Sequence, residues 1–210
     1  MKSTIFSLVG LLSAAVNGYS HDLNSHPRDL NSRGVKGGVT WTGEVLPGQT
    51  YTFTGDLQQI DAQIKAVNPD YFANPATNGT TDVEPENSLD KRWRRKQEPD
   101  CDYGKWTQKT KAQDGINYLK NSHGGSMMCT APPADERGGG CSRVSCDKDC
   151  QIWLCNDTEN DIALPCREVG KAAQELTDTC WWEQPGGMYL TRGQMFTTAT
   201  WNVIVKEHGC

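Results

Sequence analysis

The chain has 210 residues, nine cysteines and a formal net charge of −5. Residues 97–210 alone hold 11 Lys and Arg against 16 Asp and Glu, which again gives −5. Nucleic acids and anionic membranes need clustered Lys and Arg on the protein that binds them. This acidic balance argues against both as the main partner of that region, and we expect no nucleic-acid partner.

The first residues have the pattern of a secretory signal. A charged start is followed by an apolar run over residues 5–16, and small residues favour cleavage near Gly18. The run is too short to span a bilayer as a helix. The sequence therefore predicts a signal peptide at residues 1–18 and a secreted, extracellular product.

Residues 19–96 are predicted to form a pro-segment that contains a small folded unit at residues 36–72. Alternating aromatic and Thr residues at 51–54 predict a strand, and a turn signal just before them predicts a β-hairpin. A helix is expected next, with Asp56 as its N-cap and apolar residues at helical spacing. We expect this unit to dock on the downstream domain as a folding aid or mask. The alternative is an independent miniature module.

A basic cluster separates the pro-segment from every cysteine. Five of the six residues from 91 to 96 are Lys or Arg, and residues 73–96 read as a linker that ends in this cluster. Maturation proteases of the secretory route cut after paired basic residues in exposed linkers. The pairs Lys91-Arg92 and Arg94-Arg95 therefore predict cleavage after Arg92 or Arg95 by such a maturation protease. The alternatives are a nuclear-import signal and a solvated charge run.

Residues 97–210 are predicted to be the mature, cysteine-rich domain, with starts at 93 or 96 as alternatives. In a secreted chain the cysteines are expected to form disulfides, each contributing roughly 2–4 kcal/mol. Nine is odd, so at least one thiol stays free or pairs between chains, and eight paired cysteines allow 105 connectivities. The cysteines are Cys101, Cys129, Cys141, Cys146, Cys150, Cys155, Cys166, Cys180 and Cys210. Two acceptor patterns predict N-glycosylation at Asn78 and Asn156.

The periodicity of the mature domain predicts two helices and several short strands. The expected helices are 107–120 and 166–180, and the expected strands are 142–146, 151–155, 188–190, 194–196 and 199–205. Helices on one face of a small antiparallel sheet suit this order. The predicted fold class is α+β, a small disulfide-rich two-layer α/β sandwich preceded by a β-hairpin and a helix.

Several spaced stretches resemble a family of small cysteine-rich proteins secreted by filamentous fungi. They are Gly115-Ile116-Asn117-Tyr118-Leu119, Cys141-Ser142-Arg143-Val144-Ser145-Cys146, Ile152-Trp153-Leu154-Cys155-Asn156-Asp157, Gly193-Gln194-Met195-Phe196 and Trp201-Asn202-Val203-Ile204-Val205, with Val39-Thr40-Trp41-Thr42-Gly43 and Ile60-Asp61-Ala62-Gln63-Ile64 in the pro-part. Some members are effector-like, so the resemblance implies an effector-like role. The C-terminal stretch is also loosely similar to killer-toxin-type α/β sandwiches. The chain departs from the family in carrying Cys150 and Cys166 as additional cysteines.

The sequence offers little catalytic chemistry. His123, in a glycine-rich loop, would need a neighbouring carboxylate or hydroxyl nucleophile to act in a hydrolase or nuclease. The sequence contains neither Gly-x-Ser-x-Gly nor His-Glu-x-x-His. The clustered cysteines at 141–155 lack the spacing of zinc ligands. We therefore expect no enzyme, no metal and no cofactor, with a small secreted hydrolase or nuclease using His123 as the alternative.

The tandem Trp181-Trp182 is the candidate binding surface, for a carbohydrate, a sterol or a receptor. Tandem aromatic residues beside a half-cystine are more often core and rim packing, so both readings stay open. The leading hypothesis is a secreted effector or toxin-like virulence factor that binds a host (plant) target, such as a protein, glycan or membrane component. The alternatives are an antimicrobial or killer-toxin-like protein that acts on a competitor, and a structural cell-wall protein retained through its glycans or odd thiol.

Overall fold

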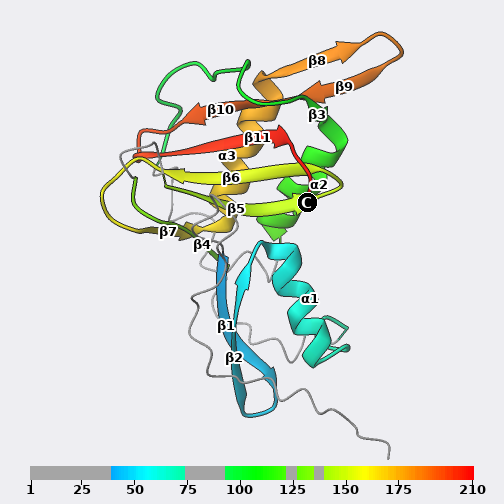
Figure 1. The fold of residues 1–210 in the computed structure, drawn as a ribbon, viewed down its shortest axis with the longest axis vertical. Coiled ribbons are helices and arrows are strands. Elements are labelled where there is room, and N and C mark those ends of the chain that lie inside the picture. Colours follow the sequence, from blue (N-terminus) through cyan, green and yellow to red (C-terminus); the bar gives the residue numbers. More distant parts are fainter. Residues whose placement is uncertain (1–38, 74–92, 122–126, 135–139) are drawn as a thin grey trace, which may run out of the picture. The chain divides into compact units, whose positions relative to one another are not determined.

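A computed structural model describes residues 39–73, 93–121, 127–134 and 140–210 of the chain. The signal peptide predicted at residues 1–18, and the candidate residues Asn78, Lys91, Arg92 and His123, lie outside the described residues. All described residues belong to one compact unit, Gly34–Cys210. Within them the fold is α+β, with three helices and antiparallel sheets (Figure 1). The predicted fold class is confirmed at this level.

Residues 39–73, which we call the hairpin–helix unit, form the elements that the sequence predicts. Strands β1 (Val39–Leu46) and β2 (Gln49–Gly55) pair antiparallel, and helix α1 (Leu57–Val67) follows directly. Apolar residues at spacings of three and four place Leu57, Ile60 and Ile64 on one buried face of α1. The predicted order of strand, turn, strand and helix is confirmed.

Side-chain hydrogen bonds fix both ends of α1. At its start, the Asp56 carboxylate accepts from the Gln59 backbone N–H at 3.0 Å, while Gln59 Oε1 accepts from the Asp56 N–H at 3.0 Å. This reciprocal pair is a capping box, which satisfies two backbone donors that the helix itself leaves unpaired. At the other end, Asn68 Nδ2 donates to the Val45 carbonyl at 2.9 Å and ties the helix to the hairpin. The predicted N-cap is thus confirmed.

The cysteine-rich part of the chain is built on a four-stranded antiparallel sheet in the order β10-β11-β6-β5. Its strands are β5 (Gly140–Asp147), β6 (Cys150–Asn156), β10 (Gly193–Phe196) and β11 (Trp201–Glu207). Lys148 and Asp149, with φ of 49° and 66°, form the tight turn between β5 and β6. Two positive φ values match the right-handed twist of the flanking strands.

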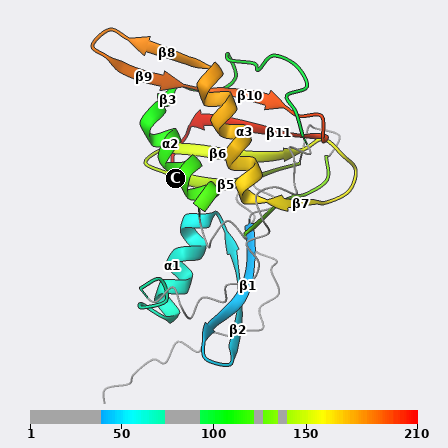
Figure 2. The ribbon, with the colours of Figure 1, turned by 180° about the vertical axis from the view of Figure 1, so that it is seen from behind.

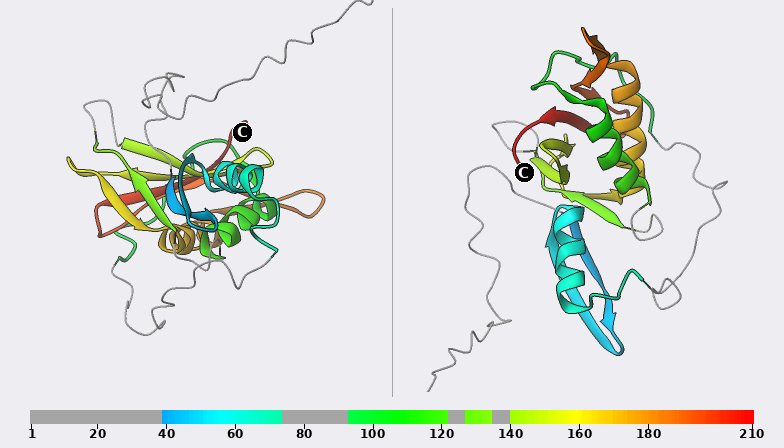
Figure 3. Two further views of the ribbon diagram at one scale, coloured as in Figure 1. Left: turned by 90° about the horizontal axis from the view of Figure 1, so that it is seen from below. Right: turned by 90° about the vertical axis from the view of Figure 1, so that its right-hand side faces the viewer.

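Two helices, α2 (Lys109–Asn121) and α3 (Cys166–Thr179), pack side by side against this sheet (Figures 2 and 3). Helix α2 contacts β5 and β6, and α3 contacts β10 and β11. Gly170 lies where the helices meet, since a Cβ there would come within 2.8 Å of Lys120 Cγ and 3.1 Å of Leu119 Cβ. A glycine costs a helix about 1 kcal/mol relative to alanine. The close approach of α2 explains why glycine stands here.

Two smaller sheets complete the described fold. Strands β3 (Thr107–Gln108), β9 (Met188–Thr191) and β8 (Trp181–Gln184) form one, while β4 (Met128–Ala131) and β7 (Ile162–Pro165) form the other. Residues 107 and 108 pair with β9, so α2 begins two residues later than predicted. Thr200, with φ of 59°, belongs to the turn before β11, so this strand begins at Trp201 and not at residue 199. Strands β4, β7 and β8 were not predicted, whereas β9 and β10, which also have four residues each, were.

Four disulfides hold this part of the chain together. The pairs are Cys101–Cys180, Cys129–Cys166, Cys141–Cys155 and Cys146–Cys210, with sequence separations of 79, 37, 14 and 64 residues. Cys141–Cys155 joins paired residues of the neighbouring strands β5 and β6, the other three join segments far apart in the chain, and Cys210 is bonded to β5. Cross-links of this kind restrict the unfolded chain and stabilise the fold by roughly 2–4 kcal/mol each. The predicted disulfide-rich character is confirmed. Among the described helices, none is long and apolar enough to cross a membrane.

Candidate binding surface on an aromatic hairpin

The hairpin formed by β8 and β9, residues 181–191, is the candidate site, and we call it the aromatic hairpin. Its strands pair from Trp181 opposite Thr191 to Gln184 opposite Met188. The turn between them uses Gly186 and Gly187, with φ of 105° and 83°, which residues with a side chain rarely adopt. Figure 1 shows that the hairpin extends beyond the end of α3.

The base of the aromatic hairpin is fixed to the rest of the domain. Cys180, immediately before β8, is bonded to Cys101. The Thr191 hydroxyl donates to the Cys180 carbonyl at 2.6 Å across this base. Arg192, just after β9, donates to the Cys101 and Gly104 carbonyls at 3.0 and 2.9 Å. The hairpin is therefore held in one orientation before any partner arrives.

Four large apolar side chains of the aromatic hairpin are about half exposed. The exposed fractions are 48% for Trp181, 48% for Trp182, 45% for Met188 and 47% for Tyr189. Exposed apolar surface is a candidate interaction site, and the register divides it into two patches, Trp181 with Tyr189 on one face and Trp182 with Met188 on the other. Neither indole belongs to the buried core, whereas both still contact neighbouring side chains, as a rim residue would.

The two faces of the aromatic hairpin differ in their surroundings. Strand alternation places Trp181 and Trp182 on opposite faces. Trp181 lies against Tyr189, with ring centroids 5.6 Å apart, whereas Trp182 lies 6.3 Å from Trp106. The guanidinium of Arg192 stacks on Trp106 at 4.4 Å from the ring centroid. The Trp182 face is thus partly occupied by the protein's own side chains.

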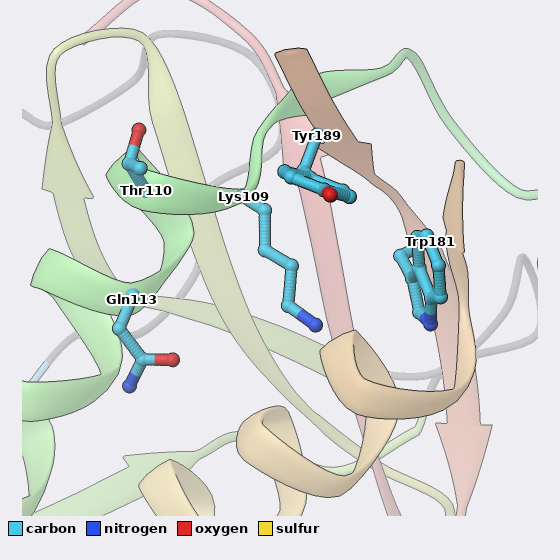
Figure 4. A pocket seen from close by; sticks show the side chains of 5 residues that line it. All are labelled: Lys109, Thr110, Gln113, Trp181 and Tyr189. Carbon is cyan, nitrogen blue, oxygen red and sulfur yellow. The ribbon is translucent and has the colours of Figure 1, made fainter. Parts of the chain in front are cut away.

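The Trp181 face borders an open groove of about 390 Å³ (Figure 4). Its lining residues are Lys109, Thr110 and Gln113 from α2 with Trp181 and Tyr189 from the hairpin. This volume is at the lower end of the range of about 300–1,000 Å³ that small-ligand sites occupy. The groove lies between α2 and the aromatic hairpin, which are far apart in the chain. The sequence alone therefore indicated Trp181 and none of the groove residues on α2.

The polar groups of the groove are held in different ways. The amide of Gln113 is paired reciprocally with that of Gln174, at 2.7 and 3.0 Å. Lys109 Nζ lies 5.7 Å from the centroid of Trp181 and 3.3 Å from an Asp178 oxygen. The Thr110 side chain is exposed. The groove can stack a ligand on aromatic rings and offer it an ammonium and a hydroxyl, and its lining contains no nucleophile paired with a base.

Half of the predicted processing cluster is part of the folded domain. The Arg94 backbone N–H donates to Thr198 Oγ1 at 3.0 Å, and its carbonyl accepts from the Thr198 N–H at 2.8 Å. Arg95 forms a β-bridge with Thr197, and its guanidinium lies 3.2 Å from Glu98. The packed structure of the cysteine-rich domain thus includes Trp93, which lies four residues before the predicted boundary at 97 and is one of the alternative starts.

The environment of Asn156 in the folded domain argues against the predicted glycosylation there. Asn156 is fully buried, and its Nδ2 donates to the carbonyls of Pro132 at 2.9 Å and Asn160 at 2.6 Å. Its Oδ1 accepts from the backbone and hydroxyl of Thr158. The Asn-Asp-Thr pattern therefore builds a turn here, and the folded domain leaves no room for a glycan on Nδ2.

Among the described cysteines, only Cys150 is free, and it is buried with 3% of its surface exposed. Burial raises the pKa of the Cys150 thiol to about 11. A buried, protonated thiol is unreactive, which argues against an intermolecular disulfide through this residue. The hypothesis of retention in a cell wall through the odd thiol loses its support.

The described residues contain no group of three or more His, Cys, Asp or Glu side chains that could hold a metal ion. Three of the four clustered cysteines at 141–155 are in disulfides. Asp157 accepts from Asn202 Nδ2 at 2.8 Å, and burial is the main cause that raises the pKa of its carboxyl. Asp157 thus has a structural contact within the domain.

No family model, no curated protein and no solved structure matches this chain.

Proposed function

We propose that the protein is a secreted, disulfide-stabilised effector or toxin-like protein that binds a host (plant) target through the aromatic hairpin, without catalysis. The observation that carries the proposal is the set of four half-exposed apolar side chains on one fixed hairpin. Binding energy at interfaces is concentrated in a few such anchors, with Trp and Tyr among the most frequent.

The rigidity of the hairpin supports a binding role. Its base is held by the Cys101–Cys180 disulfide and by the hydrogen bonds of Arg192. A surface that is fixed beforehand loses little conformational entropy when it binds. Exposed aromatic residues without a partner would only favour aggregation, and here they lie on a hairpin whose base is held by a disulfide and hydrogen bonds.

Secretion is supported by two independent features. The N-terminal sequence has the pattern of a signal peptide, and four disulfides form in the structure. Such bonds persist in oxidising compartments. The two-layer sandwich is part of the same proposal: α2 and α3 would be one layer, and the sheet β10-β11-β6-β5 the other.

The target class follows from the groove. Two aromatic rings, a lysine and a hydroxyl suit a partner with an apolar face and hydrogen-bond acceptors, such as a glycan or a protein loop. The acidic balance of residues 97–210 argues against an anionic membrane. A target on a competing microbe remains the alternative, and activity assays on both kinds of cell distinguish the two.

The test compares the secreted protein with two variants. Trp181→Ala/Tyr189→Ala removes both rings of the groove, and Tyr103→Ala, which is 38% exposed and outside the hairpin, is the matched control. Each protein is applied to plant tissue and to fungal and bacterial cultures, and its binding to plant cell extracts is measured. We expect the double variant to lose about tenfold or more in affinity, and the control to keep its affinity.

Two outcomes would overturn the proposal. The protein could leave plant cells and microbial growth unaffected, which removes the effector or toxin-like role. The double variant could instead bind as the control does, which removes the hairpin as the site. The enzymatic alternative has its own test, because loss of activity in His123→Ala with unchanged target binding would favour a hydrolase or nuclease.

A further inference from the structure

The hairpin–helix unit has no covalent link to the cysteine-rich domain other than the chain itself. All four disulfides lie between Cys101 and Cys210. The described unit, residues 39–73, contains no cysteine and therefore has no cross-link of its own. Its buried residues, such as Val39 and Leu57, belong to the same apolar cluster as the domain core. The unit therefore depends on the domain for its stability.

The unit docks on β5, the outermost strand of the four-stranded sheet. Helix α1 contacts β5, and β1 contacts both β4 and β5. Gln58 Oε1 accepts from the Cys146 backbone N–H at 3.2 Å, and Gln58 Nε2 donates to Ser145 Oγ at 2.8 Å. The Gln58 amide thus takes the place that a neighbouring strand would take at this edge.

A buried ion pair adds to these contacts. Arg143 of β5 lies 2.9 Å from Asp56 Oδ2, and the exposed fractions of the two side chains are 19% and 2%. The other oxygen of Asp56 caps α1. Removing one partner of a buried pair leaves an uncompensated charge, which is strongly unfavourable. Separation of the unit from the domain would expose both charges and the edge of β5 together.

We propose that the hairpin–helix unit stays bound to the cysteine-rich domain after proteolytic processing, as a second, non-covalent chain that caps the edge of β5. Unpaired sheet edges template aggregation, and proteins cover them. The opposite edge, β10, is covered by the chain itself, because Asp100 bridges to Gln194. The contacts of the described unit with β4 and β5 involve none of the groove residues, so the bound unit leaves the aromatic hairpin free.

The test uses the full chain with a recognition sequence for a site-specific protease inserted between residues 80 and 81. Cleavage in vitro then does not depend on natural processing. The cut protein is analysed by gel filtration and native mass spectrometry without denaturant. We expect both chains in one complex, which separates in denaturant without a reducing agent. Elution of the hairpin–helix unit apart from the domain would overturn the proposal.

Three variants examine the contacts that hold the complex. Asp56→Asn keeps a helix-capping oxygen but removes the charge that faces Arg143, and Gln58→Ala removes both hydrogen bonds to β5. Asp70→Asn, on an exposed residue of the same unit, is the matched control. We expect Asp56→Asn to weaken the association of the cut chains about tenfold or more, with a smaller loss for Gln58→Ala. Equal association in all three variants would contradict the assigned interface.

Hydrogen exchange gives a second, independent measurement. The Cys146 amide donates to Gln58, so its exchange should be slow in the cut complex and faster in Gln58→Ala. The variants keep all four disulfides, and near-UV circular dichroism shows that the domain remains folded. Equal exchange at Cys146 in both proteins would show that the unit does not cap this edge. Neither measurement involves a target, so failure of the effector hypothesis leaves this proposal standing.

Discussion

The indole of Trp93 lies edge-to-face against Trp201, with ring centroids 5.5 Å apart and an interplanar angle of 68°. The two residues are 3% and 4% exposed, and Trp93 Nε1 donates to Glu168 Oε2 at 3.0 Å. Residues at opposite ends of the domain thus share one buried contact. Trp93 lies inside the basic cluster that the sequence marks for processing, so this contact distinguishes the two predicted cleavage points.

Processing is expected after Arg92 and not after Arg95. A cut after Arg92 keeps Trp93 and the backbone hydrogen bonds of Arg94 to Thr198, whereas a cut after Arg95 removes them. N-terminal sequencing of the secreted protein should therefore read Trp-Arg-Arg-Lys. A start at Lys96 or Gln97 would show that the domain does not need Trp93.

Trp93→Ala should destabilise the domain by about 3–5 kcal/mol, because it opens a cavity beside Trp201 and removes the indole N–H that donates to Glu168 Oε2. Urea unfolding of the secreted protein, followed by fluorescence, measures the free energy of unfolding. Trp182→Ala is the control, since this indole is half exposed and should cost about 1 kcal/mol or less. Equal losses in the two variants would contradict the anchoring role.

Cys150 should not react with alkylating agents in the folded protein at about pH 8, and should take up one label per chain in denaturant. The folded pKa of about 11 lies above the ordinary value of 9.0 because burial disfavours the thiolate. The associated stability is fully present below the unfolded pKa and is lost as pH rises toward 11. Mass spectrometry counts the labels, and Cys150→Ala is the blank. Complete labelling of the native protein would refute the buried placement.

No glycan is expected on Asn156. Thr158→Ala destroys the acceptor pattern and removes the hydroxyl bond to Asn156 Oδ1. The intact mass should change only by the substitution, while stability falls by about 0.5–1.5 kcal/mol, because Asn156 Oδ1 loses the hydroxyl donor and keeps the Thr158 backbone N–H. Thr158→Ser keeps both the pattern and the hydroxyl, and serves as the control. Release of a glycan from Asn156 by an endoglycosidase would contradict the structure.

Gly140→Ala should be destabilising by about 1–3 kcal/mol or more. A Cβ at this position would lie closer than van der Waals contact to the backbone carbonyls of Pro132 and Pro133, which cannot rotate away. Gly209→Ala is the matched control, because nothing lies within 4 Å of a Cβ there. Thermal unfolding of both variants checks this. An unchanged midpoint for Gly140→Ala would show that the 132–133 segment can move.

The sequence by itself determined the elements whose apolar residues repeat with a clear period. Helix α1 and its Asp56 cap and helix α3 were predicted because their buried faces follow the helix spacing. Strands β5 and β6 were predicted on either side of the turn signal Asp147-Lys148-Asp149, although β6 is buried on both faces and shows no alternation. The disulfide-rich character followed from secretion chemistry. Strands β4 and β7, which pair with each other, were missed.

Only the tertiary structure decided which residues meet across the chain. It chose one cysteine pairing of the many allowed, left Cys150 as the free thiol, and buried Asn156 within a turn. It also joined Lys109 to Trp181 in one groove and placed Trp93 against Trp201. Contacts of this kind depend on how separate elements pack against one another. The spacing of residues within one element does not determine them.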